Sequence, residues 1–418
     1  MPNHHNHLDI IHLETKSNSP AHDGQQLNAR NSSVASEIKI LEESLKSLFA
    51  DKPTAQDFLA KKGRSAQLWL DRMQQLVDYP HLSPELRPVV LTPMLRLSKN
   101  SSLHPTCLSI KNVKKLGKHP VAAGGFGDVW KGTIGDSSKP VCLKVMKVYL
   151  NSDLEKLSIA YIREAILWRQ MAHPNLLPFL GIHQLEDAQE LCLISPWMEK
   201  GNLVEFLKAT ERGDIDHYTL VYDVASGLAY LHSKKIVHGD LKGVNILITD
   251  SLRACIADFG LSRIEKHGLG LTTSGARPTG TMRWQAPELL HGERPSLESD
   301  VYSFACVCYE IFTGLRPFPE LPNITGVILA VAQGKYPTRP QEASELSDAM
   351  WILMTECWNT TPSSRPTASQ IVERVGDMAP RASDSPASNW NWSDSLFARV
   401  RENVEYHSFS PPELYNGI

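Results

Sequence analysis

Strand-type and helix-type stretches are separated along this chain, and that order constrains the fold more than any other feature. From about Leu108 to about Ile194, short runs of β-branched residues alternate with Gly and Pro, with one helical pattern among them. Longer helical patterns then continue to about Met378. Strands followed by helices indicate an α+β unit with two lobes. At roughly 270 residues, such a unit can bury a large core of its own.

Composition and charge narrow the class of protein. Of the 418 residues, 42% are hydrophobic and 21% are charged, as in ordinary globular proteins. The net charge of -3 favours neither nucleic acid nor an anionic membrane as the main partner. Seven scattered cysteines indicate a reducing compartment, no run is apolar for the roughly 18 residues of a membrane span, and the first residues lack the pattern of a secretory signal. We therefore expect a soluble, cytoplasmic protein.

Both ends of the chain have the composition of disordered tails. Residues 1–32 are rich in His, Asn, Ser and Gln and poor in large apolar residues. Residues 379–418 begin with a stretch of Ser, Pro and Asn, and only Ser395 to Val404 suggests a short helix. Such segments bury too little apolar surface to offset the entropy lost on ordering. We predict that both tails are mostly disordered.

Residues 33–100 show helical periodicity. Apolar residues repeat at spacings of three and four at Val34, Ile38, Leu41, Leu45 and Leu48. The spacing of Thr54 and Asp57 is similar to a capping box and predicts a second helix that begins at Thr54. A third helix, with Trp69 on its apolar face, is expected to stop before Pro80, and a proline-interrupted segment follows. Two interpretations remain open: a small bundle that packs on the next unit, or a docking module for the helix of a protein partner.

A glycine-rich segment lies between two strand-type runs. It reads VAAGGFGDVWKG from Val121 to Gly132. Its glycines allow a sharp turn and a close approach of the backbone to a ligand such as phosphate, although a plain hairpin turn would use them too. Because a strand-type run follows the glycines, the segment does not fit the dinucleotide-binding fingerprint, which requires a helix there.

A strand lysine and a helix glutamate form a candidate ion pair. Lys144 lies in the strand-type run VCLKVMK, where a lone lysine usually extends to solvent. Glu164 falls on the apolar stripe of a helix predicted to end near Pro174. A carboxylate buried there needs a cation to offset its desolvation, and Lys144 is a candidate.

Two further loops carry polar residues suited to phosphate chemistry. The loop in IVHGDLKGVNILI contains Asp240, Lys242 and Asn245, which offer a carboxylate, an ammonium and an amide oxygen. This set suits a base for a hydroxyl, a charge for a transferring phosphoryl group and a metal ligand. Asp258 follows in IADFGLS, and together with Asn245 it provides the oxygen ligands that Mg²⁺ prefers.

The order of these motifs resembles that of the eukaryotic protein kinases. A Gly-rich loop, a strand lysine, a helix glutamate, Asp-x-Lys-x-x-Asn, Asp-Phe-Gly and finally Ala286-Pro287-Glu288 follow one another as in that family. The resemblance covers residues 113–378. It implies a two-lobed kinase fold, with a small β-rich N-lobe at about 113–194 and a larger helical C-lobe at about 201–378, preceded by the small helical region.

The resemblance also implies how the chain acts. It would transfer the γ-phosphoryl group of Mg-ATP to protein substrates. Lys144, paired with Glu164, would hold the α- and β-phosphates. Asp240 would orient the acceptor hydroxyl and take its proton, while Lys242 would touch the γ-phosphate.

An ATP site between the lobes follows from the same resemblance. Asn245 and Asp258 would bind Mg²⁺, and Ser195 would be the gatekeeper beside the adenine pocket. The residues implied to contact ATP are Val121, Ala122, Gly124, Gly125, Phe126, Gly127, Val129, Lys144, Pro196, Met198, Asn245, Leu247 and Asp258.

Three residues of the large lobe are implied to be structural. Asp300 would accept hydrogen bonds from the backbone of the catalytic loop. Glu288 would pair with Arg365 inside the lobe. Cys306 and Cys308 lie two residues apart on a predicted helix, so they face different ways and do not predict a metal pair.

The chain departs from the kinase pattern at two positions. Ala122 replaces the usual first glycine of the loop, which we expect to stiffen the loop slightly. Gly239 stands where an arginine usually precedes the catalytic aspartate. That arginine normally grips a phosphorylated activation loop through charge-assisted hydrogen bonds. We therefore expect the segment 262–281, with Thr272, Thr273 and Ser274 as candidate sites, to depend little on phosphorylation.

Substrate class is indicated by similarity to one group of kinases. Lys242 and Thr281 are similar to residues of serine/threonine enzymes. The segments GTMRW, DVYSF and CWNTTPSSRP look like those of the tyrosine-kinase-like group, whose members mostly phosphorylate Ser and Thr. The alternatives are dual specificity for Ser/Thr and Tyr, and an ATP-binding pseudokinase that acts as a scaffold.

Overall fold

The computed structural model describes most of the chain between residues 51 and 378. The described residues are 43, 47, 51–79, 82, 85–124, 127–137, 139–146, 154–185, 190–259, 263–264, 279–341 and 343–378. Residues 56–406 form one compact unit, to which the following description applies except at the start of the first helix. The predicted tails lie outside the described residues, as does nearly all of the helix expected between Val34 and Leu48, of which Glu43 and Ser47 are described and helical.

The second predicted helix begins earlier than expected. Helix α2 spans Lys52–Leu59, so the predicted start at Thr54 is wrong. The residue that caps it is Asp51, whose carboxylate accepts a hydrogen bond of 3.0 Å from the Thr54 backbone N–H. Pro53 then occupies the first turn, where its missing N–H costs no helical hydrogen bond. Phe58 packs edge-to-face on Trp69, with ring centroids 5.1 Å apart.

The two following helices, α3 (Gly63–Asp78) and α4 (Leu86–Ser101), pack on each other. Helix α3 ends before Pro80, as predicted, and buries Trp69. The proline-interrupted segment forms a continuous helix instead, with Pro93 inside it. An interior proline costs about 3 kcal/mol. Five apolar residues of α4 are buried and offset that cost at about 1.5–3 kcal/mol each: Val90, Leu91, Met94, Leu95 and Leu97.

The smaller lobe is built on one antiparallel sheet in the order β1-β3-β4-β6-β5, with β2 paired to β3. The strands are β1 (Val113–Lys115), β2 (Ala122–Gly124), β3 (Gly127–Ile134), β4 (Val141–Val145), β5 (Gly181–Gln184) and β6 (Leu191–Pro196). Helix α5 (Leu154–Arg169) follows β4 and packs on β5 and β6. In β4, Val141, Leu143 and Val145 enter the core, and the alternation leaves Lys144 on the opposite face.

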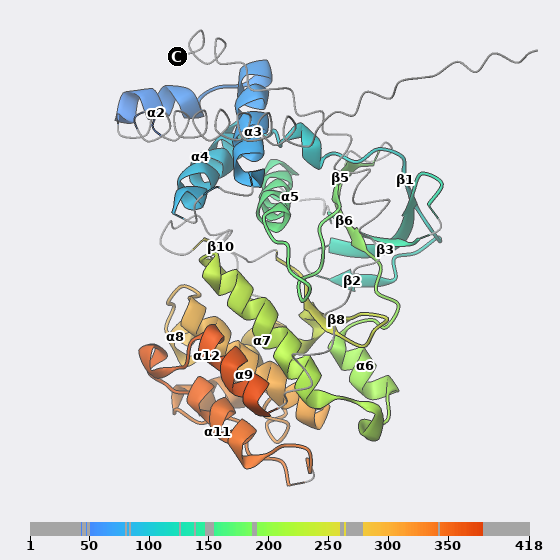
Figure 1. Ribbon diagram of the computed structural model, residues 1–418, viewed down its shortest axis with the longest axis vertical. Coiled ribbons are helices and arrows are strands. Elements are labelled where there is room, and N and C mark those ends of the chain that lie inside the picture. The colour runs from blue at the N-terminus through green and yellow to red at the C-terminus, as the bar shows by residue number, and fades with distance from the viewer. Residues whose placement is uncertain are drawn as a thin grey trace, which may run out of the picture. The chain divides into compact units, whose positions relative to one another are not determined.

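The segment between α4 and the sheet joins the sheet edge. It contains the short 3₁₀ turn η1 (Thr106–Leu108) and forms a parallel bridge between Ser109 and Ile182 of β5. The Ile110 N–H donates to the Ile182 carbonyl at 2.7 Å. This approach requires Gly181, because an added Cβ would lie 2.6 Å from the Leu108 carbonyl oxygen. Helices α3 and α4 are therefore continuous with the smaller lobe, and in Figure 1 they lie beside α5.

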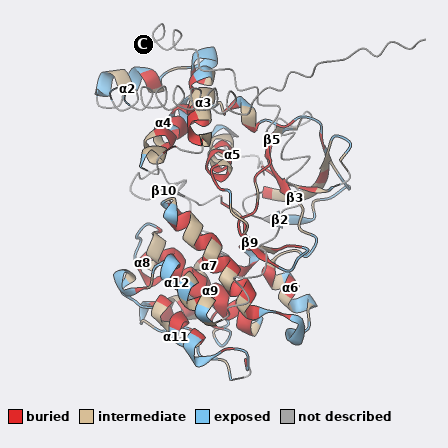
Figure 2. Cartoon of the chain, in the orientation of Figure 1, coloured by how far each residue is buried: buried red, intermediate tan, exposed pale blue. Residues whose placement is uncertain are grey.

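The larger lobe is mainly helical. Its helices are α6 (Leu203–Ala209), α7 (His217–Ser233), α8 (Pro287–Leu290), α9 (Leu297–Thr313), α10 (Ile324–Ala332), α11 (Asp348–Cys357) and α12 (Ala368–Met378). Short strands form two pairs, β7 (Ile236–Val237) with β10 (Arg263–Ile264) and β8 (Ile246–Ile248) with β9 (Ala254–Ile256). The 3₁₀ turns are η2 (Arg212–Asp214), η3 (Gly243–Asn245), η4 (Thr279–Trp284) and η5 (Pro362–Ser364). Figure 2 shows that buried residues concentrate on α7 and α9, the centre of this lobe.

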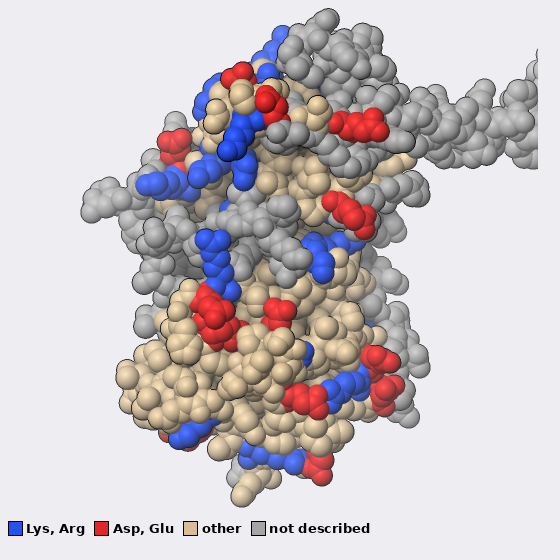
Figure 3. Space-filling view, turned by 90° about the vertical axis from the view of Figure 1, so that its left-hand side faces the viewer, with Lys and Arg blue, Asp and Glu red and all other residues tan. Residues whose placement is uncertain are grey.

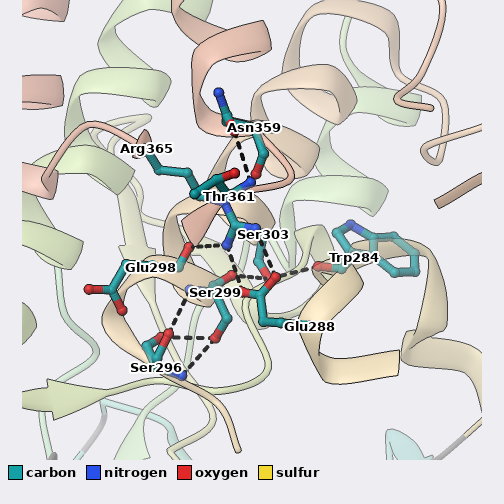
Figure 4. A network of polar contacts seen from close by, with 9 residues as sticks. All are labelled: Trp284, Glu288, Ser296, Glu298, Ser299, Ser303, Asn359, Thr361 and Arg365. Carbon is teal, nitrogen blue, oxygen red and sulfur yellow. Dashed lines mark hydrogen bonds and ion pairs between the residues drawn. The ribbon is translucent and has the colours of Figure 1, made fainter. Parts of the chain in front are cut away.

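The predicted ion pair of the large lobe is present. Arg365 donates to both carboxylate oxygens of Glu288, at 2.7 and 2.8 Å, and also to the carbonyls of Glu298 and Asn359. Nearby, Ser296 caps the start of α9 through Ser299. Figure 4 shows these contacts as one network. Arg365 therefore ties α8 and the start of α9 to the segment before α12.

The surface charges, the apolar content of the helices and the cysteines complete the description of the fold. On the face drawn in Figure 3, acidic and basic side chains are interspersed. None of the helices among the described residues is long and apolar enough to cross a membrane. All seven cysteines are free, and no cluster of three or more metal-ligating side chains occurs in the described parts of the chain.

Candidate active site

The predicted strand lysine and helix glutamate meet. The Lys144 ammonium lies 2.8 Å from Glu164 Oε1 and 2.7 Å from Asp258 Oδ1. Glu164 is buried, with 3% of its surface exposed. Strand β4, helix α5 and the segment after β9 thus converge on one cation. Asp258 has a φ of +63°, a left-handed conformation that costs a non-glycine residue energy and is common at functional sites.

Burial and charge set the ionisation of this cluster. Burial alone would lower the pKa of Lys144, but Asp258 and Glu164 outweigh it and raise the pKa above its usual value. Lys144 therefore stays cationic at neutral pH. Burial also raises the pKa of Glu164, and the neighbouring Lys144 opposes that rise. One cation, Lys144, is thus shared by two carboxylates, those of Glu164 and Asp258.

The segment between β7 and β8, which the resemblance to protein kinases identifies as the catalytic loop, brings the remaining predicted residues together. Lys242 Nζ donates to Asp240 Oδ2 at 2.7 Å and to Thr281 Oγ at 3.0 Å. The Asn245 amide donates to the Asp240 carbonyl at 2.8 Å and to Asp240 Oδ2 at 3.2 Å. Both Asp240 and Asn245 are buried. The loop and η4 are thereby joined through Lys242.

One oxygen of Asp240 is left over. Oδ2 receives both side-chain hydrogen bonds, whereas Oδ1 is buried without a hydrogen-bond partner among the described residues. A buried carboxylate oxygen without a partner costs about 1–3 kcal/mol or more. Such a cost is expected where a ligand completes the hydrogen bonding. Asp240 Oδ1 is therefore available to accept a hydrogen bond from a bound group.

Asp300 of α9 accepts hydrogen bonds from the backbone of the catalytic loop, as predicted. Its carboxylate accepts the backbone N–H groups of His238 at 2.7 Å and Gly239 at 2.8 Å. Gly239 has a φ of +80°, which glycine adopts without strain. The His238 ring lies 3.1 Å from the Ala257 carbonyl, and its other nitrogen accepts the Asp240 N–H. These bonds fix the backbone that carries Asp240.

The structure describes most of the other residues predicted to contact ATP. Val121 and Ala122 are exposed at and beside β2, Val129 pairs with Lys144 in register, and Pro196 ends β6 just before Met198. Leu247 is half-buried in β8. Gly124 ends β2, whereas Gly125 and Phe126 lie outside the described residues.

Only glycine fits at position 127. An added Cβ would clash with the Tyr161 hydroxyl and would lie 2.5 Å from the Val145 carbonyl oxygen. At a φ of +150°, any other residue would also be strained. Gly127 thus lies close to β4 and α5.

Comparison with known proteins decides the family. The model of the family described as "Protein tyrosine and serine/threonine kinase" matches residues 114–375, well over half of the chain. This chain is a protein kinase by family. The resemblance noted from its motifs and the two-lobed fold expected from it are both confirmed.

Curated relatives refine the resemblance. The kinase is 30% identical over 298 residues to "Serine/threonine-protein kinase STY46" of Arabidopsis thaliana, covering 69% of this chain and 49% of that protein. It is 29% identical over 268 residues to STY17 of the same plant, covering 63% and 44%. It is 33% identical over 259 residues to "Probable serine/threonine-protein kinase drkC" of Dictyostelium discoideum, covering 60% and 33%. The chain thus spans half or less of these relatives' lengths, and it is most like the tyrosine-kinase-like group.

An aromatic stack that links the catalytic loop to α5 was missed by sequence reasoning. Phe259 is fully buried, with its ring 5.5 Å from that of Trp168 and 5.7 Å from that of His238. Trp168 also donates to the Leu177 carbonyl at 2.6 Å. The apolar spacing of Trp168 in α5 predicted burial but could not reveal its partner 91 residues away.

A buried glutamate beneath the catalytic loop was also missed. Glu310 of α9 is 3% exposed and accepts the Gly243 N–H and the Trp284 indole N–H, both at 2.8 Å. Burial raises the pKa of Glu310 to about 7, against these hydrogen bonds. Gly243 is required here, since an added Cβ would lie 2.6 Å from Glu310 Oε1. Only its position ten residues after Asp300 on a predicted buried helix could have singled it out.

Proposed function

We propose that this kinase transfers the γ-phosphoryl group of ATP to serine and threonine hydroxyls of proteins. The observation that carries the proposal is the free oxygen of Asp240, buried beside Lys242. Lys242 and its bond to Thr281 are similar to the arrangement in serine/threonine enzymes. The relatives named STY46, STY17 and drkC are described as serine/threonine kinases or probable ones, which supports the same class.

Asp240 would act as the base or orienting group for the acceptor hydroxyl. Lys242 and Asn245 hold its Oδ2, which leaves Oδ1 to accept the hydroxyl proton. Asp300 fixes the backbone on either side of Gly239 and so limits rotation of the loop. Lys242, cationic and adjacent, would neutralise charge that develops on the transferred group. Positioning and charge, rather than a covalent intermediate, would lower the barrier.

The residues present fit ATP and Mg²⁺. Asn245 and Asp258 offer the amide and carboxylate oxygens that a hard cation prefers, and they would hold Mg²⁺. Mg²⁺ supplies neutralisation of phosphate charge when bound. Lys144, kept cationic by Asp258 and Glu164, would bind the α- and β-phosphates, and the close approach at Gly127 leaves a backbone able to cover them.

Activity is proposed to depend little on phosphorylation of the activation loop. Gly239 has no side chain to grip a phosphate, and its backbone N–H is already used by Asp300. The Lys144–Glu164 pair is formed as well. The candidate sites Thr272, Thr273 and Ser274 lie outside the described residues, so this proposal rests on Gly239 and on the assembled ion pair.

The test is phosphoryl transfer by the purified full chain with labelled ATP and Mg²⁺, followed by phosphoamino-acid analysis. Asp240→Asn is the matched control, since it preserves the side-chain shape and removes the base. Phosphoserine or phosphothreonine that disappears in Asp240→Asn would support the proposal, and phosphotyrosine beside them would extend it to dual specificity. Binding of ATP without transfer to any added protein substrate would favour a scaffold pseudokinase instead.

A further inference from the structure

Helix α5 carries two groups on which the active site depends. Glu164 pairs with Lys144, and Trp168 packs on Phe259, which in turn packs on His238 of the catalytic loop. A shift of α5 would therefore disturb both the cation that is to hold phosphates and the stack under the catalytic loop. What holds α5 in place thus bears directly on catalysis.

The C-terminal end of α5 is held by the helical region that precedes the kinase fold. Arg169 forms an ion pair of 3.2 Å with Asp78 at the end of α3, and both side chains are largely buried. Gln170 donates to Gln74 of α3 at 3.4 Å and accepts from Arg87 of α4 at 3.4 Å. Residues 169 and 170 lie within one turn of Trp168 and within two turns of Glu164.

The contacting groups are also connected among themselves. Gln74 donates to Asp78 at 2.9 Å, and Arg87 donates to the Val77 carbonyl at 3.1 Å, which joins the start of α4 to the end of α3. Hydrogen bonds and ion pairs are directional, so they fix the relative position of helices more sharply than apolar contact does. Residues 108–110 attach the same region to β5, which gives it a second fixed point on the smaller lobe.

We infer that α3 and α4 are a positioning element that holds α5 inward, with Asp78 and Gln74 as the positioning residues for Glu164. The contacts exist while Glu164 is paired with Lys144, so the element supports the assembled site and does not inhibit it. This inference rests on the proposed kinase function, because it assigns a way of sustaining that activity. This positioning role for α3 and α4 does not require a partner protein.

The test is charge reversal in the full chain, with the charge-swapped pair as the rescue. In Asp78→Lys, two cations face each other, and we expect kcat to fall about tenfold, which corresponds to about 1.4 kcal/mol of activation free energy. The peptide KM and the midpoint of thermal unfolding should change little. The double variant Asp78→Lys with Arg169→Glu restores an ion pair and should recover most of the lost kcat. Asp348→Lys is the matched control, because Asp348 forms an exposed pair with Arg339 far along the chain.

Hydrogen exchange of the α5 amides gives a readout that does not depend on phosphoryl transfer. In Asp78→Lys, residues 154–169 should exchange faster than in the wild-type chain, and the double variant should reverse the change. Should the wild-type chain transfer no phosphate, the proposed function fails and this exchange comparison alone decides the inference. Where charge reversal prevents folding, Asp78→Asn provides the same comparison with a smaller expected effect.

Three results would overturn the inference. The first is unchanged kcat and unchanged α5 exchange in Asp78→Lys. The second is a rise in kcat, which would make α3 and α4 an inhibitory element. The third is a loss of kcat that the double variant fails to restore and that accompanies a lower unfolding midpoint, since that pattern indicates only general destabilisation.

Discussion

Arg365 and Lys144 are both buried cations paired with glutamate, yet their surroundings differ. Arg365 lies wholly within the large lobe, where Glu288 and two backbone carbonyls accept its hydrogen bonds. Lys144 joins three separate elements and divides its charge between two carboxylates, one of them on a residue with strained backbone. The fully satisfied cation is suited to stability. The shared cation, Lys144, is the one that we propose binds phosphate.

Replacement of Arg365 tests the stability half of this comparison and should give the largest effect. Arg365→Ala leaves Glu288 buried without its cation, so the free energy of unfolding should fall by about 3–5 kcal/mol. Urea denaturation measures it. Asp348→Ala, which breaks the exposed pair with Arg339 from its more exposed side, is the control and should cost about 1 kcal/mol or less. Equal losses in the two variants would remove the distinction.

Replacement of Glu164 tests the functional half. Glu164→Gln removes one of the two carboxylates on Lys144, and we expect kcat to fall about a hundredfold or more, comparable to the loss of one group that stabilises a transition state. The unfolding midpoint should move little, because Asp258 still pairs with Lys144. Glu155→Gln, in the exposed first turn of α5, serves as the control for kcat. A large fall in stability with kcat nearly retained would contradict the assignment.

Glu310 sharpens the comparison, because it is a buried carboxylate whose hydrogen bonds come from the neutral N–H groups of Gly243 and Trp284. Its pKa of about 7 lies above the value of 4.5 expected in the unfolded chain, so the folded state binds more protons between these values. Stability must therefore fall as pH rises from about 4.5 to 7 and then level off.

Glu310→Gln removes this pH dependence while keeping an oxygen acceptor. The free energy of unfolding of Glu310→Gln relative to wild type should rise by about 2 kcal/mol between pH 5 and pH 7, at about 1.4 kcal/mol per unit of pKa. Chemical denaturation at a series of pH values measures the difference. Parallel stability curves for the two proteins would show that Glu310 does not titrate in this range.

The smallest effect is expected in the activation loop. With Gly239 in place of the usual arginine, the triple change of Thr272, Thr273 and Ser274 to Ala should leave kcat within about tenfold of wild type. Initial rates with a generic protein substrate check this. A loss above about a hundredfold would show that a phosphate in this loop is gripped by some other cation.

The two ion pairs could be predicted from the sequence, each for its own reason. Lys144 is a candidate partner of Glu164 because a carboxylate on an apolar helix stripe needs a cation, and the resemblance to protein kinases implies the pair of Glu288 and Arg365. The structure has both contacts. The separation into strands and then helices likewise predicted the two lobes. These features depend on local patterns, which a single sequence displays.

Contacts between elements far apart in sequence could not be predicted where neither partner belongs to a motif. Asp78 and Arg169 are separated by 91 residues, and neither belongs to a motif. The start of α2 was misplaced because Asp51, rather than Thr54, supplies the cap. Helix α4 was missed because its prolines argue against a helix, whereas its burial against α3 and α5 outweighs their cost.

The most direct test of the account is the first turnover of phosphatase-treated full chain with labelled ATP, Mg²⁺ and a generic protein substrate. The assembled Lys144–Glu164 pair and the free oxygen of Asp240 predict transfer without a lag, at a rate within about tenfold of the chain preincubated with ATP. A pronounced lag that ends only as the chain phosphorylates itself would contradict the account. So would the absence of transfer, or transfer that persists unchanged in Asp240→Asn.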